Sequence, residues 1–233
     1  LIKMQKLASQ GYYNGKNLFI ETAKAINDGG HIHASGNIPF DLNIGSTTFG
    51  KYFENDFLNL KTEAELSSLP FLSPYINELD SANGNYKIML NVKGPIGNLN
   101  RNGYIVIQDG ILHTQLLNDP IKSINGEAQL INNKLRIKNL SADLNIENVE
   151  NVGRKNSNTK IVGEINLNKF FNPQYNLKLE SKNASFKLLF LDIYGKTNLD
   201  LSIFGRDTVY ISGKIDPEEV NVFYEFATED IGT

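Results

Sequence analysis

Two histidines separated by one residue, His31 and His33, are the side chains whose type and spacing come nearest to a metal site. On a β-strand, residues two apart point to the same side, so both imidazoles could approach one ion. A zinc site needs at least one more protein ligand, and none follows at a spacing typical of such sites. We therefore interpret the pair as polar residues of one sheet face, and no metal is expected.

The other reactive side chains do not form a catalytic pattern. The carboxylates are scattered, and no two of them share the apolar setting that general acid–base catalysis uses. The chain has no cysteine, which excludes disulfides, thiol catalysis and cysteine-ligated metals. Neither a Gly-rich phosphate loop nor a Gly-x-Ser-x-Gly elbow occurs. We expect no catalytic residue, no cofactor and no enzymatic activity.

Charge and hydropathy limit the partners. The 233 residues include 23 Lys and Arg against 26 Asp and Glu, a formal net charge of −3. Without a basic excess, nucleic-acid binding is not expected. The sequence contains no run of 18 or more apolar residues, so it predicts no membrane-spanning helix. Because the sequence begins at Leu1, we expect it to be part of a longer protein, with any membrane anchor or export signal outside it.

Alternation of apolar and polar residues dominates the sequence. In one stretch Tyr86, Ile88, Leu90 and Val92 alternate with Lys87, Met89, Asn91 and Lys93. This alternation places the first four side chains on one face of a sheet. Breaks such as Gln108–Gly110 and Asn132-Asn133 contain residues that tolerate positive φ and predict tight turns. No helical pattern of ten residues separates the later strands. The sequence therefore predicts an all-β fold, a long antiparallel meander.

One stretch departs from this pattern. Leu66, Leu69, Phe71 and Leu72 do not alternate, and the range 62–68 contains good helix formers. We expect a short helical segment around residues 60–80, interrupted by two prolines. The range 55–83 would then link the end of a preceding sheet repeat, residues 1–54, to the main sheet segment, residues 84–233.

A sheet with one apolar face must cover that face or curl it inward. Two architectures satisfy this condition: a β-sandwich with an interaction or adhesin role, and a single sheet curled into a trough. Alternation by itself favours the sandwich. Tryptophan, the usual sugar-stacking residue, is absent, which disfavours a carbohydrate-binding adhesin.

The stretch from Glu78 to Leu144 contains a recognisable rhythm of glycines and alternating strands. It resembles the repeating unit of the AsmA/TamB family, clearly over 56–144 and more loosely over most of the chain. The polar insertion at 148–160 departs from the family, which often has Gly-rich sequence there. The positions that carry the resemblance are Gly84, Gly94, Pro95, Gly103, Ile105, Ile107, Asp109, Gly110, Ile111, Leu117, Pro120, Ile121, Ile124, Ala128, Leu130, Leu135, Ile137, Leu140 and Ala142.

The resemblance implies an open U-shaped groove, the β-taco, in a protein of the periplasm or cell envelope of a Gram-negative-type bacterium. Such proteins bridge the inner and outer membranes and are anchored to the inner membrane, here by a region outside this sequence. They are implicated in moving phospholipids and in assembling outer-membrane proteins with a β-barrel partner. The partners it implies are phospholipid acyl chains and, through a last strand at 220–226, an outer-membrane barrel assembly protein.

In such a groove the apolar side of the strands would face the lipid. Aliphatic residues without buried charges suit acyl chains, which gain free energy by leaving water. The residues predicted to line the groove are Ile88, Leu90, Val92, Ile105, Ile107, Leu135, Ile137, Leu144, Ile165, Leu177, Leu199, Leu201 and Ile211.

Overall fold

The computed structural model describes residues 5–27, 29–45, 47, 49–70, 79–144, 158–170, 172–188 and 193–222. These residues form twelve β-strands and one short 3-10 turn, η1 (Ile96–Asn98). The strands are β1 (Lys6–Tyr13), β2 (Asn17–Asn27), β3 (Gly30–Pro39), β4 (Phe57–Ser68), β5 (Leu79–Pro95), β6 (Asn100–Thr114), β7 (Ile121–Ile131), β8 (Lys134–Asp143), β9 (Thr159–Asn166), β10 (Gln174–Leu188), β11 (Ile193–Gly205) and β12 (Val209–Val222).

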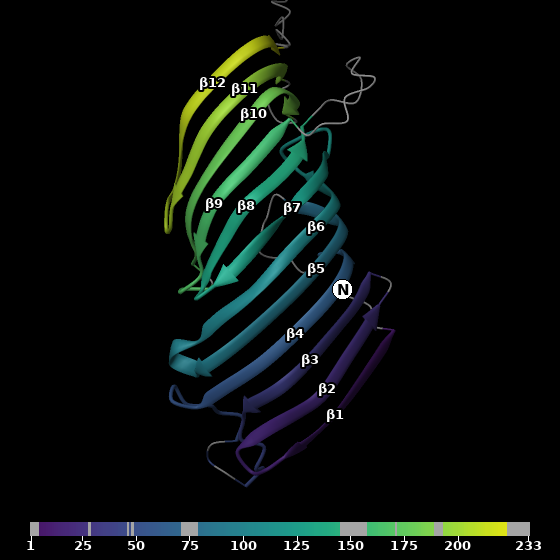
Figure 1. The fold of residues 1–233 in the computed structure, drawn as a ribbon, viewed down its shortest axis with the longest axis vertical. Helices are drawn as coiled ribbons and strands as arrows, with labels where there is room; N and C mark the ends of the chain where they lie inside the picture. The colour runs from purple at the N-terminus through teal and green to yellow at the C-terminus, as the bar shows by residue number, and fades with distance from the viewer. Residues whose placement is uncertain are drawn as a thin grey trace, which may run out of the picture.

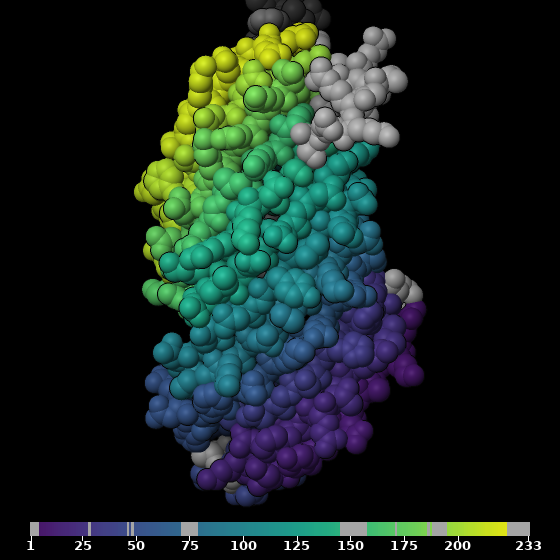
Figure 2. All heavy atoms as spheres, viewed as in Figure 1, coloured from purple at the N-terminus to yellow at the C-terminus, as the bar shows by residue number. Residues whose placement is uncertain are grey.

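All twelve strands belong to one sheet, and their spatial order is their order in the chain. Each strand pairs antiparallel with its sequence neighbours, and extensive contacts join only such neighbours. Figure 1 shows a tall stack of bowed, oblique strands with β1 and β12 at opposite ends. The space-filling view shows the same order as successive bands of colour (Figure 2). The predicted all-β meander, curled and open, is confirmed, and the described residues form no second layer of the kind a sandwich requires.

The helix expected around residues 60–80 is wrong over its first part, because 57–68 is strand β4, paired with both β3 and β5. Leu58, Leu60, Thr62, Ala64 and Leu66 alternate there with polar residues. Pairing on both sides outweighs the helix propensity of Glu and Ala. Residues 71–78 lie outside the described part of the chain. The link range 55–83 thus contains β4 and the start of β5, and residues from all three predicted ranges share one sheet.

The two turn predictions had different outcomes. Asn132 and Asn133 join β7 to β8 with φ values of 49° and 64°, the left-handed conformations of a tight two-residue hairpin. Asp109 also has a positive φ, 51°, but it lies inside β6, where the pairing with β7 shifts register. Gln108–Gly110 is therefore a β-bulge and not a turn. Asn and Asp residues with positive φ occur both in tight turns and in β-bulges, so the residue types alone do not distinguish a turn from a bulge.

The exposed surface is large for a chain of this mass. Its accessible area is 15740 Å², whereas a compact 26 kDa monomer exposes about 10,600 Å². Fully buried apolar residues are correspondingly few, and Leu69, Ala82 and Tyr86 form the main cluster among those described. A single-layer sheet explains both observations, because no other sheet or helix formed by the described residues covers either face. The described residues include no helix long and apolar enough to cross a bilayer.

Glycines inside the strands curve the sheet. Gly36 and Gly163 have φ values of 140° and 137°, and an added Cβ would collide with the carbonyl oxygens of Asn59 and Asn176 on the adjacent strands. Kinks of this kind are how sheets are bent sharply. The positive-φ strand glycines with a direct partner all share the face that carries Ile88: Gly30, Gly36, Gly94, Gly163, Gly205 and Gly213. The bends therefore act on one side of the sheet.

Replacing Gly163 with alanine tests this account of the curvature. We expect Gly163→Ala to lower the free energy of unfolding by about 1–3 kcal/mol, the cost of forcing a side chain into such a backbone conformation. The matched control is Gly45→Ala, since the nearest atom to an added Cβ there is Asn43 Oδ1 at 3.7 Å. Urea denaturation followed by circular dichroism measures both variants. Equal midpoints for the two would contradict the account.

Candidate functional site

Strand register sorts the side chains of the sheet onto two faces. Residues directly opposite each other in an antiparallel pair project to the same side. Following these pairs from β1 to β12 gives one continuous line across the sheet, which we call the central row. Its members are Leu7, Ala25, Ile32, Ala64, Ile88, Ile105, Ala128, Ile137, Gly163, Leu177, Ile203 and Ile211.

We call the face that carries the central row the inner face. All twelve members of the row are apolar or glycine, one from every strand. Eleven strand spacings of about 4.8 Å give the row a length of roughly 50 Å along the sheet. A parallel row runs on one side of it through Leu90, Leu130 and Ile165, and another runs on the other side through Tyr86, Ile107 and Leu201. The inner face is therefore a continuous apolar strip.

The register places twelve of the thirteen predicted lining residues on the inner face. Leu144 is the exception: it follows β8, two residues beyond the inner-face residue Ala142, and has no direct strand partner. Whether these residues line a lipid groove stays a prediction. The twelve are Ile88, Leu90, Val92, Ile105, Ile107, Leu135, Ile137, Ile165, Leu177, Leu199, Leu201 and Ile211.

Side-chain exposure varies along the strip. Near β4 and β5, Ala64 and Tyr86 are only 7% and 6% exposed. At the two ends, Leu7 and Ile211 are each 66% exposed. Most residues between them are half-buried, which is the exposure of a side chain packed against its neighbours but open above. The described part of the chain thus leaves a long apolar surface accessible from one side.

Connections between strands fold toward both rims of the inner face. On one rim, the β6–β7 connection reaches β10, where the Asn118 amide donates to the Lys187 carbonyl oxygen at 3.0 Å. Leu117 and Leu144 line a common small cavity there. On the other rim, Phe170 from the β9–β10 connection approaches Arg101 of β6. In each case the contact spans three strand spacings, about 14 Å in a flat sheet.

Polar atoms buried on the inner face are satisfied. The Thr159 and Ser181 hydroxyls hydrogen-bond each other at 2.7 Å. The Tyr86 hydroxyl donates to the carbonyl oxygen of Asn83 at 3.0 Å, and burial raises the pKa of this phenol. Tyr86 is therefore neutral at physiological pH, so this part of the strip carries no charge.

The outer face, opposite the central row, carries the ionic chemistry. Lys87 pairs with Glu65 at 3.3 Å across β5 and β4, and Lys178 pairs with Asp200 at 3.4 Å across β10 and β11. All four side chains are about half exposed, so each pair contributes at most about 1 kcal/mol. These pairs keep one side of the sheet hydrated.

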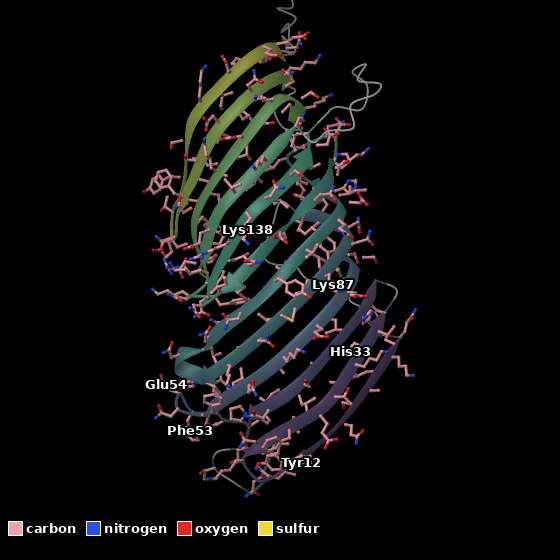
Figure 3. The ribbon with its side chains drawn as sticks, viewed as in Figure 1. Tyr12, His33, Phe53, Glu54, Lys87 and Lys138 are labelled. Atoms are coloured by element: carbon pink, nitrogen blue, oxygen red, sulfur yellow. The ribbon has the colours of Figure 1, made fainter. Side chains whose placement is uncertain are left out.

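His31 and His33 lie side by side on the outer face, as predicted, with ring centroids 5.4 Å apart. They face Glu65 and Glu63 of β4, and His31 Nε2 is 3.9 Å from a Glu65 carboxylate oxygen. Figure 3 labels His33 of β3 and Lys87 of β5, the two strands that flank β4. In the described ranges, no group of three or more His, Asp or Glu is placed to hold a metal ion.

The prediction from apolar–polar alternation in the sequence did not identify every residue of the inner face. It omitted Ala25, Ile32 and Ala64, because alanine, histidine, serine and glycine in these strands give a weak apolar alternation. It also omitted Arg101, whose β5 partner is Val92. A positively charged residue at an inner position is visible in the sequence only once the register of β6 against β5 is known.

Neither a protein-family model, nor a curated protein, nor a solved structure matches this chain significantly.

The outer-face cluster of Glu164, Lys134 and Arg136 predicts a pH dependence. Burial opposes ionisation of Glu164, but hydrogen bonds from Lys134 and Arg136, at 3.2 Å each, outweigh it and lower the pKa of this carboxyl. A lowered folded-state pKa stabilises the fold above the unfolded-state value, about 4.3. This stabilisation is lost as pH falls through the folded-state pKa.

We expect Glu164→Gln to reduce stability at pH 7 by less than about 1 kcal/mol. The difference between the variant and the wild type should shrink as pH falls from 5 to 3. Thermal unfolding at several pH values measures it. A difference that stays constant over this range would show that the carboxylate charge is not the cause.

Proposed function

We propose that this chain is a segment of an AsmA/TamB-like cell-envelope protein. Its inner face would conduct or shield phospholipid acyl chains between the inner and outer membranes, or assist outer-membrane protein assembly. The observation that carries the proposal is the continuous apolar strip of the inner face, over which the described residues place no second layer. Exposed apolar surface of this extent typically marks a binding surface.

The physical chemistry of the strip suits acyl chains. Each CH₂ group that leaves water for an apolar surface gains about 0.8 kcal/mol when fully buried. A groove open on one side buries only part of each group, so the gain per carbon is smaller. Twelve strands repeat similar aliphatic contacts along roughly 50 Å. A chain that moves along such a strip exchanges one weak contact for an equivalent one, which is what transport of a lipid requires.

The interaction-module alternative receives less support from the structure. Its sandwich form requires a second apolar layer, and the described strands form one sheet. An exposed edge strand is the other route to a protein partner. Strand β12 is such an edge, but it contains Pro217 together with Asp216, Glu218 and Glu219. Proline and charges on an edge discourage indiscriminate strand pairing, so an outer-membrane barrel partner would have to accommodate them; residues 223–226 of the predicted last strand lie outside the described part.

Native mass spectrometry combined with lipid extraction tests the proposal directly. The chain, purified under mild conditions from cells with a Gram-negative envelope, should carry phospholipid at a defined stoichiometry. It should also take up a fluorescent fatty acid after the lipid is removed. A lipid-free protein that does not take up the fatty acid would overturn the proposal.

Two neighbouring residues of β5 provide a matched test of which face is used. Leu90 lies on the inner face and Met89 on the outer face, and both are half-buried apolar side chains. We expect Leu90→Lys to weaken fatty-acid binding at least about fivefold, because a lysine ammonium must lose water when an acyl chain covers it. Met89→Lys should leave binding unchanged.

Circular dichroism and urea midpoints establish that both lysine variants fold. Among folded variants, equal loss of binding from the two faces would show that the inner face is not the binding surface. Lys87→Glu, also on the outer face, extends the comparison with a change of charge sign.

A further inference from the structure

Arg101 is the one charged residue at the inner-face positions that direct strand pairing fixes in the described strands. It lies at the start of β6, opposite Val92 of β5, which in turn faces Leu60 of β4. Arg136 of β8, two strands further along the sheet, lies on the outer face. The cation therefore marks a specific place on a face whose other paired positions carry no charge.

The guanidinium of Arg101 is positioned but not neutralised. Its Nη1 donates to Asn133 Oδ1 at 3.2 Å, and the same oxygen accepts from the Arg101 backbone amide at 2.9 Å. The ring of Phe170 lies under the guanidinium, with 5.5 Å between Cζ and the ring centroid. No carboxylate among the described residues forms an ion pair with it, and a guanidinium has five N–H donors. Most of its donors are therefore available to a ligand.

The two other described arginines are engaged differently. Arg136 Nε donates to a Glu164 carboxylate oxygen at 3.2 Å. Arg206 donates through Nη1 to the Asn172 carbonyl oxygen and through Nη2 to Gln174 Oε1. A half-buried cation without an anionic partner is costly unless water or a ligand compensates it. Arg206 also lacks a carboxylate partner among the described residues, but it lies in the β11–β12 connection, so Arg101 is the unpaired guanidinium that strand pairing places on the inner face.

Apolar surface begins directly beside Arg101. The next inner-face residue of β6 is Gly103, which has no side chain to block a ligand, and Ile105 and Ile107 follow. From Arg101 to Ile107 the strand extends about 20 Å. An acyl chain in one leaflet of a bilayer occupies about 15 Å, half of the hydrocarbon thickness. A lipid whose headgroup contacts Arg101 could therefore lay its chain on the strip.

We propose that Arg101, held by Asn133 and Phe170, binds the anionic headgroup of an acyl-chain lipid whose hydrocarbon lies on the inner face. A carboxylate or phosphate can accept two parallel N–H bonds from a guanidinium, which gives both affinity and orientation. The inference rests on the proposed function and specifies it: the strip binds hydrocarbon, and Arg101 selects for negative charge at one rim.

Titration with cis-parinaric acid and with its methyl ester at pH 8 tests the inference, because the two fluorescent probes share a chain and differ in charge. The wild-type chain should bind the acid at least fivefold more tightly than the ester. Arg101→Gln should weaken binding of the acid about 10- to 150-fold, as expected for a charge-assisted hydrogen bond, and leave binding of the ester unchanged. Arg136→Gln is the control and should change neither.

Each other outcome has a definite meaning. Equal binding of acid and ester by the wild type, or equal loss of both in Arg101→Gln, would overturn the headgroup contact while leaving chain binding in place. Failure of the wild type to bind either probe would overturn the proposed function and the contact with it. Binding of inorganic phosphate that is lost in Arg101→Gln, together with equal binding of acid and ester by the wild type, would show that Arg101 binds free anions and not a lipid headgroup.

Discussion

Backbone pairing between sequence neighbours is the interaction on which the rest of this structure depends. The described strands have no second layer to pack against, so the sheet is stabilised by its ladders of hydrogen bonds and by cross-strand side-chain contacts. Each cross-strand pair contributes only about 0.2–1 kcal/mol. Stability therefore comes from many similar small terms and not from one dense core, apart from the cluster around Leu69, Ala82 and Tyr86.

This arrangement gives the inner face two roles at once. Contacts along the central row hold adjacent strands together, and the same side chains remain exposed enough to contact a ligand. Under the proposed function, a substitution on the inner face would change stability and lipid binding together, whereas a substitution on the outer face would change stability alone. Ion pairs such as Lys87–Glu65 and Lys178–Asp200 keep the outer face hydrated and contribute little to stability. The two faces differ because apolar and polar residues alternate along each strand. Under the proposed function, a lipid would therefore contact only the apolar inner face.

Much of the fold could be predicted from the sequence, because alternation with short polar breaks specifies strands and their two faces. The inner-face placement of residues such as Ile88, Ile137 and Leu201 followed from that pattern. Strand β4 was missed because Leu66 and Leu69, read together with the prolines, masked a regular alternation from Leu58 to Leu66. Arg101 was missed because its face depends on strand pairing that the sequence does not state. The curvature has a similar origin, since strand glycines reveal their role only when their neighbours across the ladder are known.

The spatial order of the strands follows their order in the chain, and this order affects how the sheet could become longer or shorter. Each internal strand makes its extensive contacts with the strand before it and the strand after it, so removing or duplicating a whole hairpin disturbs one sheet junction and, near β6 and β10, the rim contacts of the connections. Both strand direction and the assignment of faces are preserved when strands are added two at a time. Each added hairpin extends the sheet by about 10 Å. Gene duplication and deletion could thus adjust the reach of the molecule in uniform increments without redesigning its cross-section.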